Sequence, residues 1–170
     1  SEMCIRDRTD IAVDNHARLS ELLKPVAYKG SLPKQLLVHR ESVSALIGSA
    51  DQSENFFPTF EAGLDDLTGD DWLAGAVHNY RSGSATTARI FYEHLHRAGR
   101  MSFADTLRME LNIAGQCARH PDFPEGVRAL LVDKDRKPIW EYTSTAEVPM
   151  EYVLDHFQAP WSDHPLADLV

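Results

Sequence analysis

Histidine and cysteine are the side chains that could do chemistry in this 170-residue sequence, which holds eight histidines and two cysteines. His94 and His96 lie two residues apart on a stretch with helical periodicity, so their side chains diverge by roughly 200°. Neither a His-Glu-x-x-His motif nor a paired Cys-x-x-Cys motif occurs. The sequence therefore favours surface or internally satisfied histidines, and we expect no metal site.

Cys117 and two acidic pairs favour structural roles as well. Cys117 has no His or Asp beside it in sequence, so we expect a small buried thiol; a nucleophile would need a base from a distant residue. Asp65 with Asp66, and Asp70 with Asp71, suit helix starts, where carboxylates cap backbone N–H groups. Glycine motifs for phosphate or dinucleotide binding are absent, as is the Gly-x-Ser-x-Gly elbow. The sequence alone assembles no catalytic site.

Composition narrows the class of protein. Seventeen basic residues against 26 acidic ones give a net charge of -9, which disfavours binding to nucleic acid or to an anionic membrane. No run approaches the eighteen or so apolar residues of a membrane span. The 43% hydrophobic and 25% charged fractions are typical of a globular protein, and two cysteines cannot form a disulfide framework. We therefore expect a soluble globular chain.

Residues 1–9 do not read as part of a natural domain. They contain no initiator methionine at position 1 and no charged segment leading into an apolar stretch, so they are not a secretory signal. They resemble a translated sequencing adapter. We set them aside as non-native, together with Cys4, and expect residues 10–170 to be a fragment of a longer protein.

The rest of the sequence predicts a series of short amphipathic helices and no strand. Proline, glycine and capping residues separate the helical stretches, and turn-rich or loop segments are expected at 26–33 and 49–58. The expected helices are 11–24, 33–47, 59–67, 70–83, 84–98, 102–118, 123–132 and 149–157. The fold class predicted from periodicity is therefore mainly α.

Two consecutive helices carry the strongest periodicity. Ser84 should cap the first helix and Gly99 should follow its last residue, while Ser102 and Asp105 resemble a capping box at the start of the second. We expect an apolar face to point inward in each helix and in the shorter one after them. Its members are Ala88, Phe91, Tyr92, Leu95 and Ala98, then Phe103, Leu107, Leu111, Ala114 and Ala118, then Phe123, Val127, Leu130 and Leu131.

The stretch His120–Trp140 indicates the class of protein more specifically than the helical periodicity does. A helix that opens on Glu125 and glycine runs into a charged turn containing Lys134, followed by proline and an aromatic residue. This pattern resembles the C-terminal signature of the enoyl-CoA hydratase/isomerase (crotonase) superfamily, and specifically its 3-hydroxyisobutyryl-CoA hydrolase branch. Segments 86–90, 107–117 and 161–169 agree with that branch. The sequence departs from it at 83–85 and at Asn112, where arginine is common.

The resemblance implies the helical C-terminal portion of a crotonase-like (ClpP/crotonase) α/β fold, with the β/α spiral core missing from this chain. The implied activity of the parent protein is hydrolysis of an acyl-CoA thioester, most specifically 3-hydroxyisobutyryl-CoA in valine catabolism. The oxyanion hole would lie in the missing core, so we expect no catalytic residue in this chain, no activity from it alone, and an exposed apolar face that would cover the core. The alternatives are an enoyl-CoA hydratase/isomerase, or a non-catalytic helical interaction module.

Lys134 is the one candidate binding residue that the resemblance supplies. It falls where the superfamily has a turn lysine that can approach the phosphates of coenzyme A; the alternative role, favoured by the residue pattern, is to complement a helix C-terminus. Coenzyme A would be part of the substrate, and no separate cofactor is expected. The expected partners are an acyl-CoA, the missing N-terminal core and further copies of the same protein. The expected location is the cytoplasm in a bacterium and the mitochondrial matrix in a eukaryote.

Overall fold

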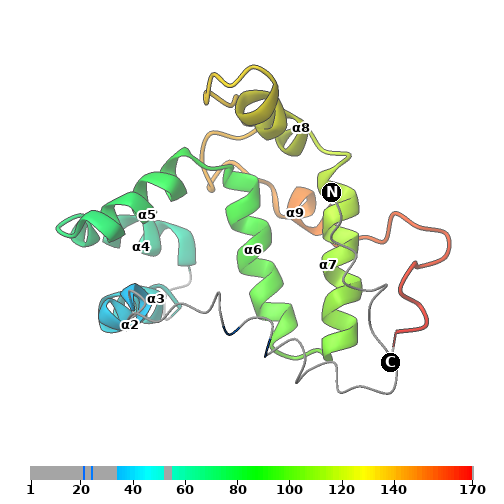
Figure 1. The fold of residues 1–170 in the computed structure, drawn as a ribbon, viewed down its shortest axis with the longest axis horizontal. Helices are drawn as coiled ribbons and strands as arrows, with labels where there is room; N and C mark the ends of the chain where they lie inside the picture. Colours follow the sequence, from blue (N-terminus) through cyan, green and yellow to red (C-terminus); the bar gives the residue numbers. More distant parts are fainter. Residues whose placement is uncertain (1–20, 22–23, 25–33, 52–54, 170) are drawn as a thin grey trace. The chain divides into compact units, whose positions relative to one another are not determined.

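The computed structural model describes residues 21, 24, 34–51 and 55–169, and the chain divides into two compact units, residues 1–40 and 41–170 (Figure 1). The predictions for residues 1–9, for Cys4, for most of helix 11–24 and for the turns at 26–33 lie outside the described residues. In the described part of the first unit, α2 is a single turn, Gln35–Val38. In the described residues no helix is both long and apolar enough to cross a membrane.

The second unit carries most of the regular structure. It begins with α3 (Arg40–Asp51), whose first residue belongs to the first unit, and continues with α4 (Phe56–Gly63), the short 3₁₀ turn η3 (Asp65–Leu67), α5 (Asp71–Ser82), α6 (Ala85–Ala98), α7 (Phe103–Cys117), α8 (Asp122–Val127), the π-helical turn η4 (Arg128–Val132) and α9 (Met150–Asp155). No strand occurs among the described residues. The mainly α prediction is therefore confirmed for this part of the chain.

The predicted helix boundaries are correct where a capping side chain marks them. Asp70 accepts hydrogen bonds from the backbone N–H groups of Trp72 and Leu73, at 2.9 and 3.1 Å. Ser84 and Ser102 cap α6 and α7 in the same way. The predicted loop at 49–58 is wrong at both ends, because α3 continues to Asp51 and α4 already starts at Phe56. Proline at the third position of α4 is tolerated there, since the first N–H groups of a helix have no intrahelical partner.

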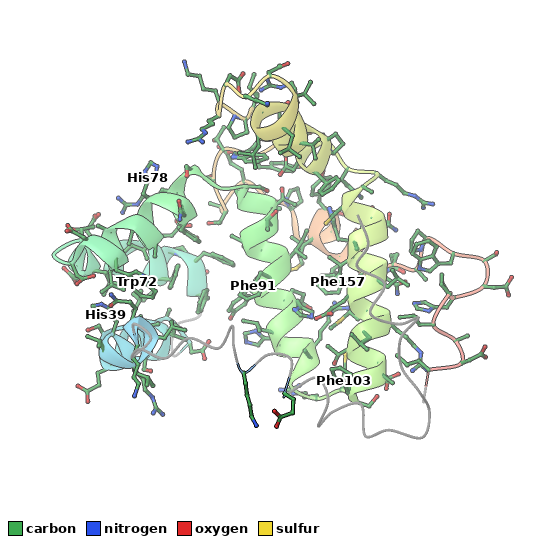
Figure 2. The ribbon with its side chains drawn as sticks, viewed as in Figure 1. His39, Trp72, His78, Phe91, Phe103 and Phe157 are labelled. Carbon is green, nitrogen blue, oxygen red and sulfur yellow. The ribbon has the colours of Figure 1, made fainter. Side chains whose placement is uncertain are left out.

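The buried core of the second unit lies where α6, α7 and α9 meet. Its members are Ala85, Ile90, Met109, Val148, Val153 and Phe157. Helix α9 packs against α6, and Val153 has no exposed surface (Figure 1). Phe157, which follows α9, completes this core, and the Arg97 guanidinium lies 4.2 Å from the centre of its ring (Figure 2). Packing of apolar side chains therefore fixes α9 and the segment before it on the two long helices.

The inward face predicted for α7 is wrong. Phe103 is 80% exposed, and Ala114 and Ala118 are exposed too, whereas Met109 and Gln116 are buried on another side of the helix (Figure 2). Helix α7 has two apolar sides, since Met109, Ile113 and Cys117 also recur at steps of four. Only the second of these sides meets α6 and α9 in the described part of the chain.

The faces predicted for helices 84–98 and 123–132 are also corrected. In α6, Ile90 is buried while Phe91 is 59% exposed. Helix 123–132 is divided into α8 and η4, and the wider π turn changes the direction of the side chains that follow. Only Ala129 is buried there; Phe123, Leu130 and Leu131 are exposed. The described residues therefore expose apolar side chains that the periodicity had predicted to be buried.

Candidate functional site

The charged turn that contains Lys134 is organised by a single guanidinium, that of Arg128. Its Nε and Nη2 atoms donate to the two carboxylate oxygens of Glu125, at 2.9 and 2.7 Å. Its Nη1 atom donates to Asp133 at 2.6 Å and to Asp135 at 2.8 Å, and Nη2 also reaches the carbonyl oxygen of Lys137 at 3.1 Å. A planar, five-donor group can make all of these bonds at once, which lysine could not.

The same contacts change the acidity of the turn. The pKa of Glu125 falls from 4.5 to about 2, chiefly because Arg128 donates to its carboxylate and secondly because the Ile139 N–H does, at 2.7 Å. Hydrogen bonds from Arg128 and from the Lys137 N–H lower the pKa of Asp135. The bonds to Glu125, Asp135 and Asp133 raise the pKa of Arg128. Glu125, Asp135 and Arg128 are therefore ionised at neutral pH, and opposite charges hold the turn together.

Lys134 lies at the tip of this turn with an unusual backbone conformation. Its φ angle is 58°, and that of Arg136 is 54°, so both residues occupy the left-handed region that side chains other than glycine rarely adopt. The Arg136 N–H donates to the carbonyl oxygen of Ala129 at 3.0 Å, which closes the turn. The Lys134 side chain is exposed and has no bonding partner among the described residues. It is free to meet an external anion.

The segment around this turn is tied to α6 and α5. The Asp122 carboxylate accepts a hydrogen bond from the Ser84 hydroxyl at 2.5 Å and another from the Glu141 N–H at 2.8 Å. The indole N–H of Trp140 donates to the carbonyl oxygen of Ser82 at 2.9 Å. Two bonds therefore hold α8 and the chain after η4 at the junction between α5 and α6, and a third joins these two segments to each other.

A second candidate site is an apolar cavity of about 500 Å³ that borders α3, α4, α5 and α6. It is lined by Ile47, Asp51, Phe56, Phe57, Phe60, Tyr80, Ala88, Phe91, Tyr92, Leu95 and His96. Figure 2 shows Phe91 on α6, and the face predicted to be buried in this helix lines the cavity instead. The rings of Phe56 and Tyr92 lie 4.2 Å apart, centre to centre. The sequence identified the apolar residues of α6 but neither the rest of the lining nor the space between them.

The remaining sequence candidates take structural positions. The Cys117 thiol is half-buried against the core, and burial, followed by the nearby Asp122 carboxylate, raises its pKa, so it stays protonated at neutral pH. His94 lies between α6 and α7, with Nε2 3.4 Å from Glu110 Oε1, and the His96 ring contacts Tyr92 in its own helix. In the part of the chain that the structure describes, no three His, Cys, Asp or Glu residues could hold a metal ion together.

Sequence reasoning missed the residues that organise the site. Arg128 follows Glu125 by three residues on a helix, a spacing that signals an ion pair, but nothing in the pattern indicates its bonds to Asp133 and Asp135. The side chains of His120 and His156 come together with a ring-centre distance of 3.9 Å, although they are 36 positions apart in the sequence. Contacts of this kind depend on how the helices pack and have no local signal.

Comparison with known proteins places the chain in a known class. The sequence profile of the enoyl-CoA hydratase/isomerase family matches residues 5–157, and the chain belongs to this family. A crystal structure of an enoyl-CoA hydratase from Rhodobacter sphaeroides has a similar fold, with a TM-score of 0.62 at 22% identity, over 84% of this chain and 42% of that one. Over the matched residues, this chain therefore has the same fold as the corresponding part of that enoyl-CoA hydratase.

Curated relatives point to one branch of the family. The chain is 32% identical over 96 residues to the mitochondrial 3-hydroxyisobutyryl-CoA hydrolase of Dictyostelium discoideum, covering 56% of this chain and 25% of the relative. It is 36% identical over 76 residues to the human enzyme of that name, covering 45% and 20%. The 3-hydroxyisobutyryl-CoA hydrolase-like protein 5 of Arabidopsis thaliana matches at 26% identity, with 76% and 34% covered. The resemblance to this branch is confirmed, and the chain spans a fifth to a third of these relatives.

Proposed function

We propose that this chain is the helical C-terminal part of an acyl-CoA thioester hydrolase whose substrate is 3-hydroxyisobutyryl-CoA, an intermediate of valine catabolism. The observation that carries this proposal is the similarity to relatives named for that activity, over 96 residues in one case and 76 in another. Membership of the enoyl-CoA hydratase/isomerase family supports the same class of substrate.

The chemistry of thioester hydrolysis assigns different roles to this chain and to the rest of the protein. An oxyanion develops on the thioester carbonyl when water attacks, and two backbone N–H donors stabilise it best when they are fixed before the reaction. We place those donors, and the carboxylates that direct the water, in the part of the relatives that this chain does not span. The role left for this chain is to cover the substrate with its exposed apolar side chains and to contribute a phosphate contact.

Lys134 is the residue that we propose for this contact. Its ammonium is exposed and unpaired within the described residues, and the turn that carries it is held by Arg128. A phosphate of coenzyme A therefore would not have to compete with an internal carboxylate, and ordering the turn in advance lowers the cost of binding. If Lys134 instead only complements the carbonyl end of η4, its removal will change stability and leave coenzyme A affinity unchanged.

A pair of variants separates these two roles. Lys134→Gly removes the ammonium and places glycine where φ is positive, so the turn should stay as stable or become more so. Lys137→Gln removes a neighbouring charge while keeping the backbone groups that bond to Asp135 and Arg128. We expect calorimetric titration with coenzyme A to show binding about fivefold weaker for Lys134→Gly and unchanged for Lys137→Gln. Equal affinities in all three proteins would refute the phosphate contact.

The activity itself is tested by following free thiol. Incubated with 3-hydroxyisobutyryl-CoA, the 170-residue chain should release none, whereas the protein extended upstream of residue 10 should release coenzyme A. Turnover by the chain alone would contradict the proposal. Hydration of crotonyl-CoA by the extended protein without thiol release would identify an enoyl-CoA hydratase, and no reaction with either thioester would leave a non-catalytic interaction module.

Partners and location follow from the same assignment. We propose an acyl-CoA as the small-molecule partner, and the remainder of the protein, or further copies of it, as the surface that covers the exposed apolar residues of α6, α7 and α8. The relatives from Dictyostelium discoideum and Homo sapiens are named as mitochondrial. The mitochondrial matrix is therefore the proposed location in a eukaryote, and the cytoplasm in a bacterium.

A further inference from the structure

Two histidine rings stack on each other where α9 meets the end of α7. The ring centres of His120 and His156 are 3.9 Å apart, with 33° between the ring planes. His156 is only 2% exposed, and Tyr152 lies edge-on against both rings, at 5.1 and 5.3 Å. Helix α9 is thus attached to the segment after α7 through two groups that can each take up a proton.

The hydrogen bonds place a proton on the same nitrogen of both rings. In each ring Nδ1 lies 2.8 Å from a carbonyl oxygen, that of Gln116 for His120 and that of Tyr152 for His156, and a carbonyl can only accept. Nδ1 therefore carries a hydrogen in both. The Nε2 atom of His120 lies 3.1 Å from Asp155 Oδ2. Among the described residues no carboxylate forms an ion pair with His156, and burial lowers its pKa, so its ring is neutral at neutral pH.

The other charged and titratable groups around the pair are few and mostly acidic. Asp155 and Tyr152 come from α9, Asp122 from α8, Cys117 from the end of α7, and Glu141 and Tyr142 from the segment after η4. From α6, Arg97 lies over the ring of Phe157, beside His156 in sequence. Asp155 and Asp122 favour a positive charge on His156. Burial of the His156 ring and its contact with His120 oppose that charge.

We propose that the His120–His156 pair is a pH-sensitive latch for α9, closed while the His156 ring is neutral and released when that ring is protonated. Burial, and then the neighbouring His120, lower the pKa of His156 below 6.5 in the folded chain. The released ring regains its ordinary pKa, so opening takes up one proton. The latch is therefore fully closed above about pH 6.5 and weakens as the pH falls. Between the ordinary pKa of histidine and the lowered pKa of His156, uptake of one proton makes the opening equilibrium about tenfold more favourable for each pH unit.

Hydrogen exchange of the amides in residues 150–158, measured on the full 170-residue chain and corrected for the intrinsic pH dependence, reports this opening. We expect exchange to accelerate by up to about tenfold between pH 6 and pH 5, with little change between pH 8 and pH 7. His78→Gln, at an exposed histidine on α5, is the matched control and should behave like the unmodified chain (Figure 2).

Two variants and one spectrum decide the proposal. His120→Phe keeps a ring against His156 but removes the neighbour whose charge lowers the pKa of His156, so the acceleration below pH 6 should become weaker; His156→Gln should abolish it. An unchanged pH dependence in either variant would overturn the proposal. Should His156→Gln fail to fold, the histidine NMR resonances of the unmodified chain decide. Protonation of His156 with an ordinary pKa, and without faster exchange in α9, would overturn the latch. Protonation with a lowered pKa, coupled to faster exchange in α9, would support it.

Discussion

Replacement of Ser84 by alanine tests how α8 is attached to α6. The Ser84 hydroxyl accepts a hydrogen bond from the Thr87 N–H at 3.0 Å and donates one to the Asp122 carboxylate at 2.5 Å. Ser102 offers a matched control, because it caps α7 through the Asp105 N–H at 3.1 Å but donates only to the Asp105 side chain within the same turn. Both variants lose a cap; only Ser84→Ala also loses a bond across 38 positions.

The expected energies differ enough to be measured. An N-cap serine is worth about 1 kcal/mol, so Ser102→Ala should lower the free energy of unfolding by about that amount. A hydrogen bond to a charged group adds about 1.5 to 3 kcal/mol, and the half-buried position of Ser84 and Asp122 preserves its strength. Ser84→Ala should therefore cost about 2.5 to 4 kcal/mol.

Urea unfolding followed by circular dichroism at 222 nm measures both variants. With a slope of about 2 kcal/mol per molar urea, the midpoint should fall by about 0.5 M for Ser102→Ala and by more than 1 M for Ser84→Ala. Equal shifts would refute the reasoning, since they would show that the bond between Ser84 and Asp122 contributes no net stability.

Three further predictions use the same assay or a pH titration. Gly115→Ala should destabilise by about 1 to 3 kcal/mol, because its methyl carbon would lie 3.0 Å from the Trp161 ring, whereas Gly75→Ala, with nothing nearby, should stabilise by up to about 1 kcal/mol. Val153→Ala should cost about 2 to 3 kcal/mol, because two methyl groups leave a site with no exposed surface, and an unchanged urea midpoint would contradict this. Since the pKa of Glu125 is depressed from 4.5 to about 2, the stability that it contributes should be complete above about pH 4.5 and be lost as the pH falls to 2; loss starting near neutral pH in an acid titration of Trp140 fluorescence would contradict this.

Local sequence signals predicted the helices better than the faces they bury. Asp70, Ser84 and Ser102 all cap the helices assigned to them, because a cap depends only on residues within one turn. The inward face of α7 was wrong, because a helix with two apolar sides gives the same periodicity whichever side meets a partner. Phe103 lies on the unburied side and Met109 on the buried one, and only the packing of α9 decides between them.

Only part of the candidate site could be predicted from the sequence, because some of its residues belong to a local pattern and others depend on how the backbone folds. Lys134 was proposed through a resemblance that covers the whole turn and also includes Glu125, and its role stays a prediction. The role of Arg128 was not predicted, since it depends on a backbone that folds back with positive φ at positions 134 and 136. Asn112 departs from the branch pattern, and its side chain accepts a hydrogen bond from the Trp161 indole at 2.7 Å, a partner 49 positions away.

The segment that follows α9 is held along α7 mainly through its backbone. Arg108 donates to the carbonyl oxygens of Leu166, Ala167 and Leu169, and Gln116 donates to that of Gln158 at 3.1 Å. Because every residue type has a carbonyl, most side chains in this segment can be exchanged without losing a bond. One substitution at Arg108, in contrast, releases three attachments at once. We therefore expect most positions of the segment after α9 to tolerate substitution, whereas Arg108 on α7 should not.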